Sequence, residues 1–364
     1  GMKSSLVSRE VIADSIEVSM RGHCYDGLVG IAGCDKSLPG IMMSMLRLNV
    51  PSVFLYGGSI LPGKFEGKEV TVQDVFEAVG EYDANRISEE ELKCLEKVAC
   101  PSAGSCGGQF TANTMACVAE ALGLSILGSS STPAPFESRD EFAYKSGEVV
   151  MQLIHKQLKP RDIVTKDSLI NAARVVACSG GSTNAALHLP AIANEIGIDF
   201  DLLDVTQIFK ETPYIADLKP GGKYLAKHLY EIGGVPIILK SLLDGGYLIG
   251  DCMTVSGKTL AENLEDIVHD TKAQKIIYST SKPISKTGGV VGLQGNLAPD
   301  GAIVKVAGMK SLEFKGTARC FDSEEEAFEA VSKKHYASGD VIVIRYEGPK
   351  GGPGMREMLA TTAA

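Results

Sequence analysis

The chain has 364 residues, a formal net charge of −9 and a pI near 5.3, so its composition argues against a polyanionic partner. Tryptophan is absent and aromatic residues make up only 6%, which gives no support to stacking platforms for nucleic acid. No apolar run approaches the roughly 18 residues that span a bilayer, and the first residues lack the pattern of a signal peptide. We therefore expect neither a nucleic-acid nor a membrane partner.

The first elements predict an α/β sheet with parallel strands. An amphipathic pattern predicts a helix over 11–21, and a glycine-bounded apolar run predicts a buried strand over 27–33. A helix over 41–48 and a second strand over 51–56 follow. Ligands of such sheets gather at the carboxyl ends of the strands, and the residues Cys34-Asp35-Lys36 stand at one of these ends.

The middle of the chain reads as helical and its end as mostly β. Helical patterns cover 71–121, 138–158, 166–177, 224–230 and 237–243. After about residue 269, short β-like runs alternate with glycine and proline turns; these runs are 275–278, 289–293, 302–306 and 341–346. We predict an α/β domain over 1–270, followed by a mostly β domain over 271–364.

The nine cysteines are an odd number in a chain too long to need disulfide staples. A reducing compartment is therefore expected, either a bacterial-type cytoplasm or the matrix of an organelle. Five cysteines have no second cysteine at a spacing that indicates a shared site, and we interpret them as core or surface residues: Cys24, Cys94, Cys117, Cys252 and Cys320.

The segment Gly33-Cys-Asp-Lys-Ser-Leu-Pro-Gly40 places a thiol, a carboxylate and an amine side by side between a strand and a helix. A thiolate suits iron and a carboxylate suits Mg²⁺, while Lys36 could act as a point charge or, after reaction with CO₂, as an oxygen ligand. The alternative is a buried cysteine beside a solvated Asp-Lys pair. From composition alone the two interpretations carry equal weight.

The segment Cys100-Pro-Ser-Ala-Gly-Ser-Cys-Gly-Gly108 holds two thiols in a glycine-rich loop, just before a helix that begins near Thr111. A helix N-terminus favours a thiolate, so the loop could hold a metal. It could equally be a capping loop with incidental thiols, because the spacing is neither Cys-x-x-Cys nor a ferredoxin pattern.

Two further loops are candidates. The run Cys178-Ser-Gly-Gly-Ser-Thr-Asn184 could cradle an anion or could cap the next helix, on which we interpret His188 as structural. The loop 345–355 follows a strand and is rich in glycine and proline, with Glu347 at its start. It could be a surface turn, but such a composition is typical of a close approach to a ligand.

Taken together, these segments resemble the dihydroxy-acid and sugar-acid dehydratase family along essentially the whole chain. The resemblance includes four further motifs, in order: Tyr56-Gly-Gly-Ser-Ile-Leu-Pro-Gly63, Thr111-Ala-Asn-Thr-Met-Ala-Cys117, Gly180-Gly-Ser-Thr-Asn184 and Gly295-Asn-Leu-Ala-Pro-Asp-Gly301. It implies an α/β N-terminal domain and a β-barrel domain, here incomplete at its C-terminus, in a homodimer.

The resemblance also implies the cofactors. In the family, three cysteines hold a [2Fe–2S] cluster, and Cys34 and Cys106 match the second and third of them. A Mg²⁺ ion is bound at positions that match Asp35, Lys36 (carboxylated in the family) and Glu347. The family's first cluster cysteine and one Mg²⁺-binding aspartate have no match here, nor does the motif with its catalytic serine, so the catalytic base is not assigned. The chain resembles a member cut at both ends, and we expect it to hold the cluster poorly or not at all.

The implied reaction removes water from a small 2,3-dihydroxy carboxylate to give a 2-oxo acid. The segments around Pro39 and 56–63 are more similar to the enzyme of valine and isoleucine biosynthesis, with 2,3-dihydroxy-isovalerate and 2,3-dihydroxy-3-methylvalerate as substrates, than to aldonate dehydratases. A metal-free binding fragment is the alternative from another class. A nucleotide-binding protein is disfavoured, because neither a Walker A run nor a GxGxxG after a strand is present.

Overall fold

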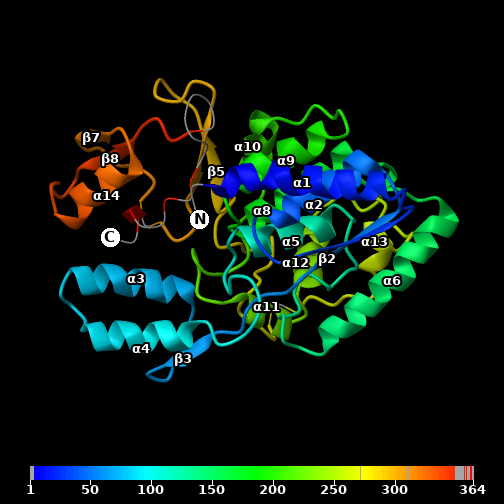
Figure 1. Ribbon diagram of the computed structural model, residues 1–364, viewed down its shortest axis with the longest axis horizontal. Coiled ribbons are helices and arrows are strands. Elements are labelled where there is room, and N and C mark those ends of the chain that lie inside the picture. Colours follow the sequence, from blue (N-terminus) through cyan, green and yellow to red (C-terminus); the bar gives the residue numbers. More distant parts are fainter. Residues whose placement is uncertain are drawn as a thin grey trace. The chain divides into compact units, whose positions relative to one another are not determined.

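A computed structural model of the chain describes residues 4–270, 272–309, 311–348, 356, 358 and 361–362 (Figure 1). The chain divides into two compact units. One comprises residues 12–61 and 102–309, and we call it the large unit; the other comprises residues 1–11, 62–101 and 310–364, and we call it the small unit. Helix α1 (Ser5–Gly22) runs across the division.

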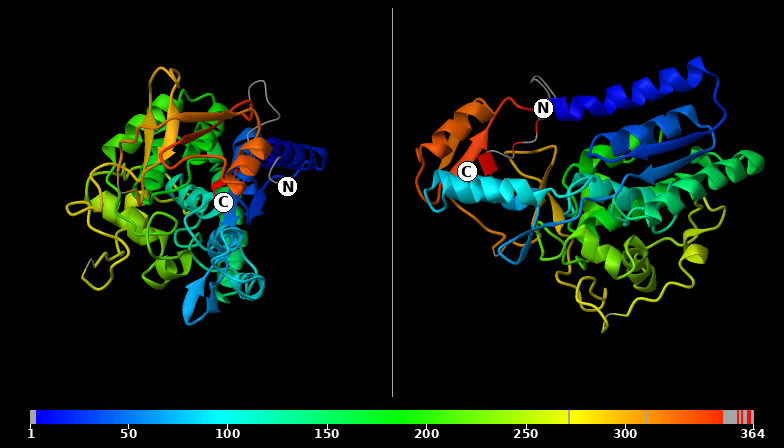
Figure 2. Two further views of the ribbon diagram at one scale, coloured as in Figure 1. Left: turned by 90° about the vertical axis from the view of Figure 1, so that its left-hand side faces the viewer. Right: turned by 60° about the horizontal axis from the view of Figure 1, so that its bottom comes forward.

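The large unit is built around the parallel pair β1 (Leu28–Ala32) and β2 (Ser52–Tyr56), which lie side by side in Figure 2. Leu28 pairs with Ser52 and Ala32 with Tyr56, so both strands end at the same edge. The crossover helix α2 (Ser37–Leu48) packs on both strands. Almost all of its residues from Leu38 to Leu46 are buried, because this stretch is nearly free of charge.

Further helices complete the core of the large unit. Helix α5 (Thr111–Ala121) is buried on every face, as its small and apolar residues allow, and packs on α8 (Lys166–Cys178). Helix α6 (Ser138–Lys156) packs on β1 and β2. The other elements are α7 (Pro160–Ile163), α9 (Ala185–Asn194), α10 (Leu202–Glu211), α11 (Ala226–Glu231), α12 (Val235–Asp244), α13 (Leu260–Asn263) and the antiparallel pair β5 (Val290–Leu293) and β6 (Ala302–Lys305).

The small unit contains two short sheets and three helices among its described residues. These are the antiparallel hairpin β3 (Gly63–Phe65) and β4 (Lys68–Val70), helices α3 (Val72–Asp83) and α4 (Glu89–Ala99), the parallel pair β7 (Ala318–Phe321) and β8 (Val341–Ile344), and helix α14 (Glu324–Ser332). Helices α3 and α4 pack on each other around Ala78, Leu92 and Leu95.

A capping box begins helix α4. The Ser88 hydroxyl accepts from the Glu91 amide at 3.2 Å, and the Glu91 carboxylate accepts from the Ser88 amide at 2.8 Å. We expect Ser88→Ala to lower the free energy of unfolding by about 1 kcal/mol, because amide groups of the first turn lose their acceptor. Urea titration of the two proteins measures the difference, and Ser88→Thr serves as the control that keeps the cap.

The α/β class predicted from the sequence is confirmed, and the first four predicted elements match α1, β1, α2 and β2. The described residues form four two-stranded sheets and no closed barrel, so the barrel implied by the resemblance is not seen in them. The predicted domain boundary between residues 270 and 271 stays a prediction. In the structure, β5 and β6 belong to the large unit, whereas β7 and β8 belong to the small unit.

The strand predicted over 275–278 is wrong. Ile276 and Ile277 are buried, but only one isolated bridge, between Ala216 and Ile277, involves this run. The side chain of Gln274 supplies the missing partners: its Oε1 accepts from both isoleucine amides at 2.6 and 2.8 Å, and its Nε2 donates to the Ile277 carbonyl at 2.6 Å. The segment 215–217 supplies two more partners, because the Asp217 amide donates to the Ile276 carbonyl and the Tyr278 amide donates to the Ile215 carbonyl, both at 2.8 Å. The backbone groups are thus satisfied without a regular strand.

Candidate metal-binding loops

Two loops leave the sheet together at the carboxyl ends of β1 and β2. The Gly57 amide, directly after β2, donates to the carbonyl of Ala32 at the end of β1 at 2.7 Å. A Cβ on Gly57 would lie 3.4 Å from the Cα of Gly33. The two loops therefore start in contact, at Gly33 and Gly57, at the edge where the sequence predicts ligand-binding residues.

The loop after β1 presents Cys34 to solvent. The Ser37 hydroxyl donates to the Cys34 carbonyl at 2.8 Å and accepts from the Cys34 amide at 3.2 Å, which closes the turn into α2. Asp35 is half-buried, and its Oδ2 lies 3.1 Å from the Nζ of Lys36, whose side chain is 4% exposed. The amine of Lys36 is thus paired with the Asp35 carboxylate, and the metal-binding role of this loop stays a prediction.

The second thiol comes from a loop that is hydrogen-bonded to the segment after β2. The Ser105 amide donates to the Gly58 carbonyl at 3.0 Å, and the Ile60 amide donates to the Ser105 carbonyl at 2.7 Å. Cys106 is half-buried and next to this junction. Cys34 and Cys106 therefore stand on two loops that both contact residues 57–58, which brings the two predicted cluster ligands to one edge of the sheet.

The thiols at this edge suit iron and the Asp35 carboxylate suits Mg²⁺, but these candidate side chains are few. Neither Cys34 nor Cys106 is in a disulfide, and an iron–sulfur ligand must be a thiolate. Within the described part of the chain, no three or more His, Cys, Asp or Glu side chains gather closely enough to hold a metal ion. The two thiols therefore fit an iron–sulfur centre in chemistry, and their role as its ligands stays a prediction.

Glu347 belongs to the small unit, and its carboxylate is buried. Its Oε1 accepts from the Glu324 amide at the start of α14 at 3.0 Å. Its Oε2 lies 3.0 Å from the Nε of Arg356. The predicted Mg²⁺ ligand therefore has an arginine partner in this structure, and its role as a ligand stays a prediction. Residues 349–355 of the glycine-rich loop lie outside the described residues.

Three of the remaining cysteines are buried. Burial raises the pKa of Cys117 to about 12 and that of Cys252 to about 11, and it raises the pKa of Cys178 well above its ordinary value. A buried neutral thiol is a poor nucleophile and a poor ligand. Cys24, Cys94 and Cys320 are exposed. The interpretation of the five unpaired cysteines as core or surface residues is confirmed.

The loop Cys178–Asn184 is fastened to the first turns of α5. The Ser182 hydroxyl pairs with that of Thr111 at 2.8 Å, and the Ser182 amide donates to the Thr114 hydroxyl at 3.0 Å. Asn184 Nδ2 donates to the Thr111 hydroxyl at 2.8 Å. The predicted capping of the next helix is not seen, because Asn184, the N-cap residue of α9, makes no side-chain cap, and the anion cradle stays a prediction. His188 is fully buried, in keeping with a structural role.

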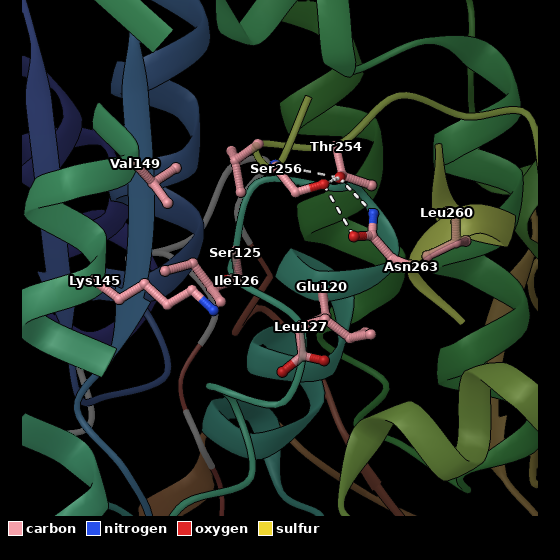
Figure 3. A pocket seen from close by; sticks show the side chains of 11 residues that line it. Glu120, Ser125, Ile126, Leu127, Lys145, Val149, Thr254, Ser256, Leu260 and Asn263 are labelled. Atoms are coloured by element: carbon pink, nitrogen blue, oxygen red, sulfur yellow. Dashed lines mark hydrogen bonds between the residues drawn. The ribbon is translucent and has the colours of Figure 1, made fainter. Parts of the chain in front are cut away.

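A cavity of about 140 Å³ lies elsewhere in the large unit (Figure 3). Lys145 and Val149 line one side, while Thr254 and Asn263, joined by a 2.9 Å hydrogen bond, line the opposite side. None of the predicted ligands lines it. Its buried carboxylate is Glu120, which accepts from the amides of Gly128 at 3.0 Å and Ser130 at 2.7 Å.

Glu120 makes stability depend on pH. Burial raises the pKa of its carboxyl to about 7, above the ordinary value of 4.5. Between these two values the folded chain binds more protons than the unfolded chain, so the free energy of unfolding falls as the pH rises from about 4.5 to about 7. The contribution is about 2 to 3 kcal/mol.

The variant Glu120→Gln removes this titration while keeping the side-chain shape. We expect the fall in unfolding free energy between pH 5 and pH 7.5 to be about 2 kcal/mol smaller in the variant than in the unmodified chain. Urea titrations at the two pH values measure it. Equal pH dependence in both proteins would show that Glu120 titrates in its ordinary range.

Two residues at this edge were missed from the sequence. Tyr56 is the last residue of β2 and Asn113 stands in the first turn of α5; both are buried and both contact the Cys106 loop. A polar residue inside the otherwise small and apolar run 111–121 was the available signal for Asn113. Tyr56 begins the motif 56–63 that carries the family resemblance, but no local pattern assigns it a role beyond that of a strand residue.

The fold and these loops define a class: an α/β protein that presents two cysteines and a carboxylate at the carboxyl edge of a parallel strand pair. The sequence models of the dihydroxy-acid/6-phosphogluconate dehydratase N-terminal and C-terminal domains match residues 1–263 and 275–364. The chain belongs to this family.

Curated proteins similar to this chain carry names from the same family. The chain is 69% identical to "Dihydroxy-acid dehydratase" of Parvibaculum lavamentivorans, 68% to "Dihydroxy-acid dehydratase" of Pelagibacter ubique and 66% to "Dihydroxy-acid dehydratase 2" of Mesorhizobium japonicum. Each match covers 100% of this chain and, in the same order, 63%, 64% and 62% of the relative. The chain thus spans somewhat less than two thirds of the length of these proteins. Among the described helices, none combines the length and apolar character that a membrane crossing demands.

Proposed function

We propose that this chain provides the metal-binding α/β part of a dihydroxy-acid dehydratase, a hydro-lyase that converts a 2,3-dihydroxy carboxylate to a 2-oxo acid. The observation that carries the proposal is the placement of Cys34 and Cys106 on two loops that both contact residues 57–58 at the carboxyl ends of β1 and β2. The names of relatives at 66–69% identity support the same reaction.

Two thiols at one edge suit a [2Fe–2S] cluster, which Cys34 and Cys106 would hold together with a further ligand. Such a cluster, when bound with one iron open to substrate, supplies a Lewis acid for the departing C3 hydroxyl. The protein's own contribution is to fix the two thiols: Ser37 closes the turn at Cys34, and the Gly58–Ser105 bond anchors the Cys106 loop.

Asp35, Lys36 and Glu347 are the proposed Mg²⁺ ligands. Asp35 offers a half-buried carboxylate next to the thiol loop. The buried Lys36 amine becomes an oxygen donor if its nitrogen adds CO₂ and loses a proton, which gives a carbamate. Glu347 exchanges its Arg356 partner for the ion in this proposal. A Mg²⁺ ion held by these residues would supply positive charge for the substrate carboxylate and C2 hydroxyl.

The substrate that we propose is 2,3-dihydroxy-isovalerate or 2,3-dihydroxy-3-methylvalerate. We further propose that the enzyme is a homodimer and acts in the cytoplasm of a bacterial-type cell. The test is a dehydration assay with the chain extended to the length of its relatives and loaded anaerobically with iron and sulfide. We expect 2-oxo acid from the branched dihydroxy acids at a rate at least about 100-fold above that with aldonates, because a pocket built for a branched chain leaves extra hydroxyl groups unpaired. Turnover of aldonates alone would contradict the substrate, and light scattering measures the dimer mass.

A further inference from the structure

Two buried polar residues, Tyr56 and Asn113, connect β2, α5 and the loop that carries Cys106. The side chain of Tyr56 is fully buried and that of Asn113 is 4% exposed. They come from different elements, at the end of a strand and at the start of a helix. Buried polar groups of this kind persist in proteins when all their hydrogen bonds are made.

The contacts of Asn113 go to this one loop and to Tyr56. Its Nδ2 donates to the carbonyls of Cys106 and Gly108, both at 2.6 Å. Its Oδ1 accepts from the Tyr56 hydroxyl at 2.8 Å. The Tyr56 hydroxyl also pairs with the hydroxyl of Ser105. The two side chains therefore contact the residue before Cys106, Cys106 itself, and the second residue after it.

The loop depends on these contacts more than a helix or strand would. Residues 104–108 hold three glycines and form no helix or named strand, so their side chains offer little apolar surface to hold the loop in place. One end of the loop is tied to Gly58 through the Ser105 amide. From Cys106 onward, Asn113 binds the carbonyls of Cys106 and Gly108 and keeps them against α5, while the Gly107 carbonyl between them accepts from the Ala226 amide at 2.8 Å.

We propose that Tyr56 and Asn113 are positioning residues that hold the Cys106 backbone on both sides and thereby orient its thiol toward the metal centre. The inference rests on the proposed function only for the identity of that centre. Neither residue binds metal or substrate in this account; each acts through Cys106.

The large unit contains a matched arrangement that serves as the control. The buried Asn171 of α8 donates through Nδ2 to the Ile249 carbonyl at 2.9 Å, and its Oδ1 accepts from the Ile249 amide at 2.9 Å. The same Nδ2 contacts the Sγ of Cys252 at 3.4 Å. Asn113 and Asn171 are thus two buried asparagines that each fasten a loop with its own cysteine.

The experiment labels the cysteines of the folded chain with iodoacetamide at one pH and follows each by mass spectrometry. We expect Asn113→Ala and Tyr56→Phe, which keeps the ring, to raise the labelling rate of Cys106 at least about fivefold, with Cys34 and Cys252 unchanged. Asn171→Ala should raise the rate at Cys252 and leave Cys106 unchanged. An unchanged Cys106 rate in both variants, or an equal rise at Cys252, would overturn the proposal.

A second readout separates orientation from general loosening. In the chain extended to the length of its relatives and loaded with iron and sulfide, we expect a chelator to remove iron at least about threefold faster from Asn113→Ala and Tyr56→Phe than from the unmodified protein, and no faster from Asn171→Ala. Equal loss from all three variants would contradict the positioning role. Failure of the unmodified protein to bind iron would count against the proposed function, while the labelling result still decides whether the two residues fix the loop.

Discussion

Replacement of Cys106 by serine is expected to abolish iron–sulfur loading and to reduce dehydration at least about 100-fold, because a hydroxyl is a far poorer ligand for iron than a thiolate. Cys34→Ser should have the same effect, since both thiols belong to one edge of the sheet in this account. The measurement is iron and sulfide per chain after anaerobic reconstitution, followed by the dehydration rate, in the chain extended to the length of its relatives.

The matched control for the two serine variants is Cys24→Ser. Cys24 is an exposed thiol in the large unit, outside the loops at the sheet edge. Its replacement should leave loading and rate within about twofold of the unmodified protein. Full iron content in either Cys34→Ser or Cys106→Ser would remove that cysteine from the proposed ligand set.

The second large effect is expected at Gly58, where the backbone has φ +96°, a conformation that favours glycine. A Cβ at this position would lie 2.6 Å from the Ala134 amide nitrogen and 2.8 Å from the Thr132 carbonyl oxygen, both backbone atoms that cannot turn away. Because strain and overpacking add, Gly58→Ala should lower the free energy of unfolding by roughly 3 to 5 kcal/mol. It should also disturb the Cys106 loop, since the Gly58 carbonyl is the acceptor for Ser105.

Gly33→Ala is the control for this prediction. Gly33 stands on the neighbouring loop, next to Cys34, but its φ is not positive and a Cβ there would meet nothing within 4 Å. We expect its unfolding free energy to stay within about 0.5 kcal/mol of the unmodified chain. Urea titrations of both variants measure the difference, and equal stability of the two would refute the assignment of Gly58 as a strained position.

The sequence predicted the parts of the site that depend on local pattern. Alternating glycine and apolar runs predicted β1 and β2, and parallel pairing placed Cys34 at their carboxyl edge. The approach of the Cys106 loop could not be predicted from spacing, because it depends on the hydrogen bonds of Ser105 with Gly58 and Ile60, which join segments more than 40 residues apart.

The false strand at 275–278 and the missed residue Tyr56 have related causes. In both places a side chain makes hydrogen bonds that periodicity does not record: Gln274 accepts from the amides two and three residues after it, and Tyr56 donates to Asn113, which in turn binds the Cys106 carbonyl. Helix α14 was missed within a stretch that reads as β, although Ser323 and the three following glutamates are an N-terminal signal.

The central claim is that Cys34 and Cys106 ligate one iron–sulfur centre. The most direct measurement is anomalous scattering at the iron absorption edge from crystals of the protein at the length of its relatives, reconstituted with iron and sulfide. The account predicts iron density within bonding distance of the sulfur atoms of both Cys34 and Cys106. Iron bound at other residues, or at only one of these two cysteines, would contradict it.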